Sequence, residues 1–150
     1  MNAVIYEVSD SVATLTLNRP ESLNSVNPTM IEALLESSAR AASDQTVRAV
    51  IVRGAGQHFM AGGDLKWFHE QIALPAETRR SCFEGLIEGV HASVLHFKNM
   101  NKPVIASVHG AVAGFGLSLM MAADLALASE SAYFTLAYSN IALSPDGGAT

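Results

Sequence analysis

Cysteine is almost absent from this chain of 150 residues, in which Cys82 is the only one. A single cysteine excludes an internal disulfide and a zinc site built from several cysteines, and it is compatible with a reducing compartment. Positive charge is also scarce, because 9 Lys and Arg residues stand against 14 Asp and Glu residues and give a formal net charge of −5. A nucleic-acid surface normally needs a basic patch, so no nucleic-acid partner is expected.

Charged residues of both signs make up only 15% of the chain, whereas hydrophobic residues make up 49%. This balance indicates one folded globular domain, residues 1–150, that is long enough to bury a core. The N-terminus lacks the basic and apolar regions of a targeting peptide, which favours a cytoplasmic location. Residues 103–128 carry little charge, but Pro103, Asp124 and three glycines interrupt them. They therefore predict a buried strand–turn–helix, and no membrane span is expected.

Strands and helices alternate along the chain. Two β-rich runs, 4–8 and 12–17, flank a polar turn at 9–11 and predict a hairpin. Asn27 before Pro28 is typical of a helix start, and apolar residues at helical spacing continue that helix to about residue 43. The remaining pattern predicts strands at 48–54, 102–110, 125–129 and 132–136, a long helix at 75–98 and a short helix within 111–124. This order is typical of an α/β fold with largely parallel strand pairing.

Two glycine-rich loops follow predicted strands, "FMAGGDL" at 59–65 and "HGAVAGFG" at 109–116. Glycine lets a backbone approach a ligand closely, and a helix start presents N–H groups without intrahelical partners. If the loops converge, two backbone donors could stabilise a developing negative oxygen, as in an oxyanion hole. Tight turns are the alternative interpretation. A dinucleotide-binding loop is disfavoured, because the third glycine of that fingerprint is replaced by Leu119.

Four stretches together resemble the crotonase (enoyl-CoA hydratase/isomerase) superfamily: "LNRPESLNSVN", "HFMAGGDLK", "KPVIASVHGAVAGFGLSLMMAADLALAS" and "YFTLAYSNIALSPDGGAT". The resemblance implies a spiral of repeated ββα units and an acyl-CoA thioester as ligand, with coenzyme A as part of the substrate and no separate cofactor. It also implies a homotrimer or hexamer for the full-length protein. The C-terminal helices of the family have no counterpart here, so we expect this chain to be the core portion of a longer protein.

The resemblance assigns roles to individual residues. The backbone N–H groups of Gly63 and Phe115 would be the two oxyanion donors, although many relatives have glycine where Phe115 stands. Asp64 would either contact the ligand or tie its loop together. The residues expected to bind the substrate are Ser22, Leu23, Ala61, Asp64, Leu65, Gly114 and Tyr138.

Two departures from the family pattern bear on the reaction. The hydratases use a pair of glutamates, whose positions correspond here to Ser118 and Tyr138, and neither side chain is a carboxylate. Hydration needs a proton to be removed from water and another to be delivered to carbon. Asp146, in "SPDGGAT", stands where some enoyl-CoA isomerases and ring-opening isomerases carry a carboxylate. A turn role for Asp146 is the alternative, because Pro-Asp-Gly is a favourable turn sequence.

A single carboxylate suits isomerisation of an enoyl-CoA. Asp146 would remove a C2 proton, the oxyanion hole would stabilise the dienolate, and Asp146 would return the proton to C4. Burial in a pocket formed by residues such as Leu117, Tyr138, Ile141 and Leu143 would make Asp146 a stronger base.

Three other functions remain open from the sequence. They are a hydratase-type lyase, a dehalogenase in which His91 or His96 activates water, and a crotonase-fold scaffold without activity. No metal is expected, because His58, His69 and His109 show no ligand spacing with carboxylates.

Overall fold

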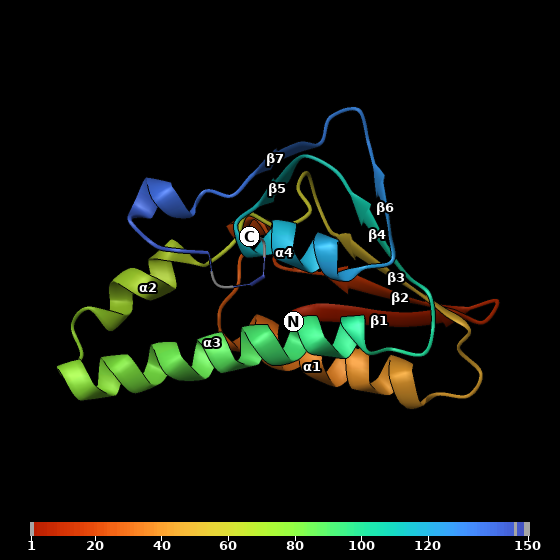
Figure 1. Cartoon of the computed structure of the whole chain (residues 1–150), viewed down its shortest axis with the longest axis horizontal. Coiled ribbons are helices and arrows are strands. Elements are labelled where there is room, and N and C mark those ends of the chain that lie inside the picture. Colours follow the sequence, from red (N-terminus) through yellow and green to blue (C-terminus); the bar gives the residue numbers. More distant parts are fainter. Residues whose placement is uncertain (1, 146, 149–150) are drawn as a thin grey trace.

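A five-stranded sheet forms the centre of the protein (Figure 1) in the computed structural model, which describes residues 2–145 and 147–148. The strands lie in the order β1-β2-β3-β4-β6. β1 and β2 pair antiparallel and form the expected hairpin, whereas the pairs β2–β3, β3–β4 and β4–β6 are parallel. The bounds are β1 Val4–Ser9, β2 Val12–Leu17, β3 Ala49–Gly54, β4 Val104–Val108 and β6 Leu125–Ala128.

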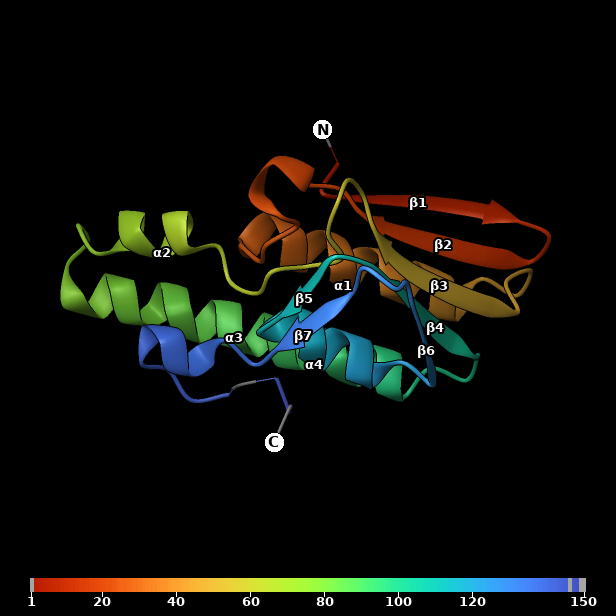
Figure 2. The ribbon, with the colours of Figure 1, turned by 90° about the horizontal axis from the view of Figure 1, so that it is seen from above.

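A second, two-stranded sheet lies beside the end of the first (Figure 2). It pairs β5 (Ala111–Ala113) in parallel with β7 (Tyr133–Thr135). Met60 forms an isolated bridge to Val112 of β5, so the segment after β3 is held against this small sheet. The second sheet therefore brings the two glycine loops to the same end of the molecule.

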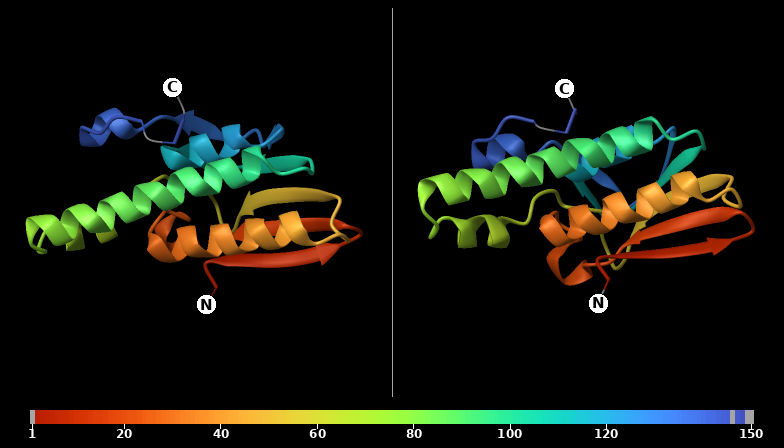
Figure 3. Two further views of the ribbon diagram at one scale, coloured as in Figure 1. Left: turned by 60° about the horizontal axis from the view of Figure 1, so that its bottom comes forward. Right: turned by 90° about the horizontal axis from the view of Figure 1, so that it is seen from below.

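Two long helices lie side by side on one face of the main sheet (Figure 3), namely α1 (Pro28–Ser43) and α3 (Ala76–Lys98). The Asn27 side chain caps α1 by accepting a hydrogen bond from the Met30 N–H at 3.0 Å, as expected from its sequence. The shorter α4 (Phe115–Ala122) packs against α3 and β5. The N-terminal part of α3 and the short α2 (Leu65–Gln71) project away from the sheet toward the cavity described below.

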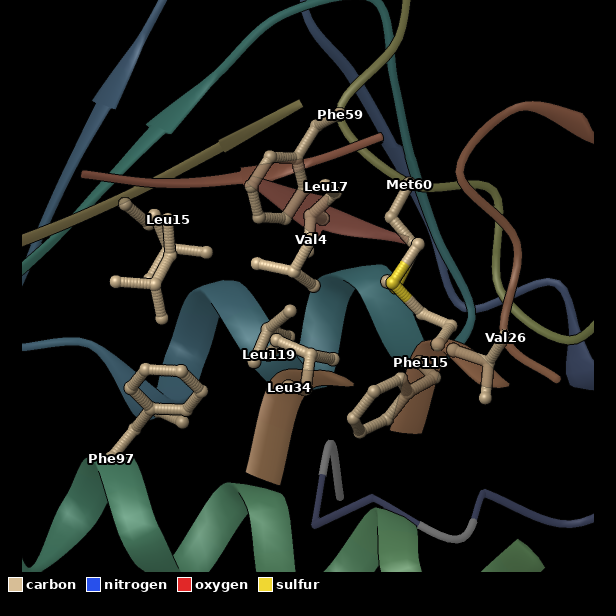
Figure 4. Packing of buried hydrophobic residues seen from close by; sticks show 14 of the residues in the cluster. Val4, Leu15, Leu17, Val26, Leu34, Phe59, Met60, Phe97, Phe115 and Leu119 are labelled. Carbon is tan, nitrogen blue, oxygen red and sulfur yellow. The ribbon is translucent and has the colours of Figure 1, made fainter. Parts of the chain in front are cut away.

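The core lies between the sheet and the helices (Figure 4). Leu15, Leu17 and Leu34 are fully buried there, and so are Phe59 and Met60 from the first glycine loop. Complete burial of one such side chain stabilises the fold by about 1.5–3 kcal/mol. Because Phe59 and Met60 are anchored in the core, the glycines that follow them start from a fixed backbone position.

The predicted α/β class and the parallel pairing are confirmed, but one local prediction is wrong. The strand expected at 102–110 ends at Val108, because Gly110 takes a positive φ of 55° and turns the chain into β5. A Cβ at Gly110 would also meet the Gln57 carbonyl oxygen, so the turn needs glycine there. The helix α2 was not expected from the sequence; Asp64 caps it through the Trp67 N–H.

The stretch 103–128 is divided among β4, β5, α4 and β6. The first strand, the helix and the last strand were expected from the sequence, whereas β5 was not. Among the helices of the described residues, none has the length and apolar character needed to cross a membrane.

Candidate active site

Two glycine turns meet at the end of the second sheet. Gly62 has a φ of 92°, and a Cβ on it would lie 3.2 Å from the Ala113 carbonyl oxygen and 3.6 Å from the Phe115 nitrogen. Gly114 has φ 50° and ψ −123°, and a Cβ on it would lie 3.3 Å from the Gly62 Cα. Side chains rarely adopt these backbone conformations, so glycine is required at both positions. The convergence of the two loops expected from the sequence is therefore present.

Hydrogen bonds hold both turns in place. The Val26 N–H donates to the Gly62 carbonyl at 2.7 Å, and the Asp64 N–H donates back to the Val26 carbonyl at 2.9 Å. On the other side, the Gly114 N–H donates to the Thr135 carbonyl of β7 at 3.0 Å. These bonds fix the backbone on either side of Gly63 and directly before Phe115.

The N–H groups of Gly63 and Phe115 donate to no acceptor within residues 2–145 and 147–148. Gly63 lies between the two bonded positions of its bridge to Val26, so its own N–H is not used by that bridge. Phe115 is the first residue of α4, where an N–H has no intrahelical partner and the helix dipole is positive. Gly63 and Phe115 line the same cavity.

That cavity has a volume of about 1230 Å³ and is bordered mostly by apolar side chains. Nine of the ten residues predicted as catalytic or substrate-binding line it: Gly63, Phe115, Ser22, Leu23, Ala61, Asp64, Leu65, Gly114 and Tyr138. The tenth, Asp146, lies outside the described residues. Ile141 and Leu143 line the cavity as expected. Leu117 is not in the lining; it packs partly buried against the core cluster, so its expected place in the acyl pocket is wrong.

Asp64 has a structural role in this arrangement. One carboxylate oxygen accepts from the Arg19 Nη2 at 2.9 Å, and the other accepts from the Trp67 N–H at 3.2 Å. The Arg19 Nη1 also donates to the Ser25 carbonyl at 2.7 Å, which ties three segments together. Of the two alternatives for Asp64, tying the loop is the one supported by these bonds.

Phe115 is only 3% exposed, and its ring lies near Val26, Leu34 and Met60 in the core (Figure 4). An aromatic residue at this position therefore fills part of the core. The ring also lies close to Gly147, since a Cβ on Gly147 would be 3.2 Å from the Phe115 Cδ2.

Ser118 and Tyr138, the positions that the resemblance assigns to the hydratase glutamates, differ in their surroundings. Tyr138 is buried and lines the cavity. Ser118 is 2% exposed and does not line it, and its hydroxyl has no hydrogen-bond partner among the described residues. A Cβ on Gly147 would lie 2.5 Å from the Ser118 Oγ and 2.6 Å from its Cβ. The backbone of Gly147 thus occupies the space directly beside Ser118.

The sequence did not identify the cavity wall formed by α3. Phe83, Leu86, Ile87 and Val90 follow one another at spacings of three, one and three residues, so they lie on one helix face and border the cavity. That periodicity predicts one apolar face, on which Leu86 and Val90 are buried and Ile87 is exposed, and it could not distinguish a face that meets the core from one that meets a ligand. Phe68 of α2, which also lines the cavity, lies in a segment for which the sequence predicted no element.

Three of the five histidines, His58, His96 and His109, have hydrogen-bond partners outside the described cavity lining. The Ala111 N–H donates to His58 Nδ1 at 3.0 Å, and His109 Nε2 lies 3.0 Å from the Gly56 carbonyl oxygen. His96 Nδ1 lies 3.0 Å from the Ser38 Oγ. Neither His91 nor His96 is in the described lining, which weakens the dehalogenase alternative. Within the described residues, no three His, Cys, Asp or Glu side chains are grouped so that they could hold a metal ion.

Comparison with known proteins agrees with this geometry. The family described as enoyl-CoA hydratase/isomerase matches residues 7–150. The 1,2-epoxyphenylacetyl-CoA isomerase of Escherichia coli is 37% identical over 150 residues, which cover 100% of this chain and 56% of the relative. The trans-2-decenoyl-acyl-carrier-protein isomerase of Streptococcus mutans is 37% identical over 145 residues, covering 97% of this chain and 54% of the relative. The chain spans about half the length of these curated relatives.

A solved structure confirms the expected fold. The enoyl-CoA hydratase from Polaromonas superposes with a TM-score of 0.87 and 34% identity, covering 97% of this chain and 55% of the hydratase. The names of these relatives include both isomerases and a hydratase, so they do not distinguish the two reactions. Nearly the whole length of the chain matches the family, and its fold matches a solved relative, so this chain belongs to the enoyl-CoA hydratase/isomerase family of the crotonase superfamily.

Proposed function

We propose that the protein is an enzyme that acts on an acyl-CoA thioester and shifts a C=C bond from C3 to C2 of an enoyl-CoA. The observation that supports this proposal is that the Gly62 and Gly114 turns lie against each other and that Gly63 and Phe115, which follow them, line one apolar cavity. Two preorganised backbone donors would stabilise the charge that builds on the thioester oxygen when a C2 proton leaves. Each such donor contributes about 3–4 kcal/mol to a charged transition state.

In this mechanism the carboxylate of Asp146 takes the C2 proton, and the electron pair of the C2–H bond moves into a dienolate whose oxygen accepts from the two N–H groups. The protonated carboxyl group then delivers the proton to C4, and the double bond comes to lie between C2 and C3. No atom is gained or lost. The assignment of Asp146 as the base rests on the sequence. It is supported by the position of the neighbouring residue, because Gly147 packs against Ser118 and against Phe115, the proposed oxyanion donor.

The carboxylates of the described lining favour isomerisation over hydration. Only Glu21 and Asp64 are present there. Both oxygens of Asp64 are engaged by Arg19 and the Trp67 N–H, and Glu21 is exposed in the 3-10 helix Pro20–Ser22. Hydration needs an acid and a base at the reacting carbons, whereas isomerisation needs one carboxyl group that performs both transfers in turn.

The test is incubation with 3-enoyl-CoA and, separately, with 2-enoyl-CoA, followed by analysis of mass and thioester conjugation. We expect the 3-enoyl substrate to become conjugated without a change in mass, and we expect Asp146→Asn to abolish this turnover. The matched control is Asp10→Asn, which makes the same change in the exposed turn of the hairpin. Addition of water to 2-enoyl-CoA, undiminished in Asp146→Asn, would instead assign a hydratase and remove Asp146 from the mechanism.

The homotrimer or hexamer implied by the family and the cytoplasmic location implied by the N-terminus stay predictions. Sedimentation of the purified protein and fractionation of cells would test them.

A further inference from the structure

The inner wall of the cavity carries a cluster of aromatic rings. Phe68 of α2 and Phe83 of α3 both line the cavity, with ring centroids 5.1 Å apart and planes at 69°. Trp67 packs behind them, 5.9 Å from the Phe68 centroid and 5.6 Å from that of Phe83, again in edge-to-face geometry. Each ring is thus fixed in orientation by the other two before any ligand enters.

This cluster lies next to one of the oxyanion donors. A Cβ on Gly63 would lie 2.5 Å from the Phe68 Cζ, so the tip of that ring touches the Gly63 backbone. A thioester oxygen bound by the Gly63 N–H would place the first few carbons of the acyl group beside Phe68 and then Phe83. Phe68 and Phe83 would therefore contact the part of the acyl group that lies close to the thioester carbonyl.

Resting on the proposed acyl-CoA function, we propose that the acyl group carries an aromatic ring within a few carbons of the thioester, as in a 4-aryl-3-butenoyl-CoA, for which an arylacetyl-CoA serves as a binding probe without the double bond. A ring in this position can meet Phe68 and Phe83 edge to face, as they meet each other. Such aromatic pairs contribute beyond the apolar area they bury, by about 2- to 10-fold in affinity for each pair. A saturated group gains only from its buried area.

Phenylacetyl-CoA and cyclohexylacetyl-CoA separate these two contributions, because both rings have six carbons and the saturated one is the bulkier and more apolar. Burial alone predicts equal or tighter binding of the cyclohexyl compound. The proposal predicts that phenylacetyl-CoA binds about 2- to 10-fold more tightly to the purified protein in titration calorimetry. Trp67, the only tryptophan, gives a second readout, since its fluorescence should change when a ring joins the cluster.

Phe83→Leu removes one ring while keeping an apolar side chain, and we expect it to reduce the preference for the phenyl compound to near onefold. Phe134→Leu makes the same change on β7, where Phe134 is exposed and outside the cavity lining, and it should retain the preference. Equal binding of the two thioesters to the unsubstituted protein, or a preference that survives in Phe83→Leu, would overturn the aromatic inference alone. Binding of neither thioester would overturn the acyl-CoA function together with it.

Discussion

Substitution of Gly114 by alanine tests the oxyanion hole directly. The φ of 50° and ψ of −123° at Gly114 lie in a region that side chains rarely adopt, and a Cβ would stand 3.3 Å from the Gly62 Cα. The strain alone should lower the free energy of unfolding by about 1–3 kcal/mol. Part of it can be relieved by a rotation of the peptide that carries the Phe115 N–H, which would turn that donor away from the cavity.

Loss or misalignment of one oxyanion donor lowers kcat by about 100- to 1000-fold. We therefore expect Gly114→Ala to lower kcat for 3-enoyl-CoA about 100-fold or more while KM changes little, because the apolar wall and the CoA contacts remain. The assay measures conjugation of 3-enoyl-CoA under conditions in which urea unfolding shows the variant to be folded. This separates a loss of donor geometry from a loss of folded protein.

Gly85→Ala is the matched control. Gly85 lies in α3, and a Cβ there would meet nothing within 4 Å. Alanine is favoured over glycine in a helix by about 0.8–1 kcal/mol, so this variant should be slightly more stable and equally active. If Gly114→Ala kept kcat within about twofold of the unsubstituted protein, the N–H of Phe115 would not stabilise the transition state and the reasoning from the converging loops would be refuted.

Two further predictions concern packing and pH. Gly147→Ala should destabilise the protein, because the new Cβ would meet Ser118. Ser118→Gly should rescue this variant and Ser118→Ala should not, since the Ser118 Cβ itself would lie 2.6 Å from the added atom. A double-mutant cycle of unfolding free energies that shows no coupling between positions 147 and 118 would contradict the contact. Hydrogen bonds from the Thr46 hydroxyl and N–H lower the pKa of Asp44, so its contribution to stability should be present above about pH 4 and be lost as the pH falls through the lowered pKa. Asp44→Asn should flatten that part of the acid-unfolding curve, and an unchanged curve would show that Asp44 does not contribute there.

Local patterns predicted most of the elements. The Asn27 cap, the hairpin at 9–11 and the buried strand runs depend on neighbouring residues, and each is present. The helix α2 was missed because it has only seven residues and follows two glycines, and its start depends on the Asp64 cap. That carboxylate is oriented by Arg19, which is 45 positions away, so no local pattern shows that it is fixed.

Residues of the candidate site could be predicted only where they lie within a recognisable sequence motif. The resemblance to the crotonase superfamily named Gly63 and Phe115 within the glycine loops, yet the convergence of these loops depends on the bridge between Met60 and Val112. The α3 wall could not be recognised as part of a ligand site, because apolar spacing is the same whether a helix meets a core or a ligand. The contact between Ser118 and Gly147 joins residues far apart in sequence, and no spacing rule predicts it.

The contact between Ser118 and Gly147 bears on whether a glutamate could occupy position 118. Position 118 is on α4, three residues after the Phe115 donor, and its hydroxyl is already within van der Waals reach of Gly147. A glutamate there would need the space that the Gly147 backbone occupies, so the long carboxylate and this close turn exclude each other. Serine at position 118 supplies no carboxylate and leaves room for Gly147 to pack against α4, the helix that begins at Phe115. Introducing glutamate at position 118 alone would therefore displace that packing.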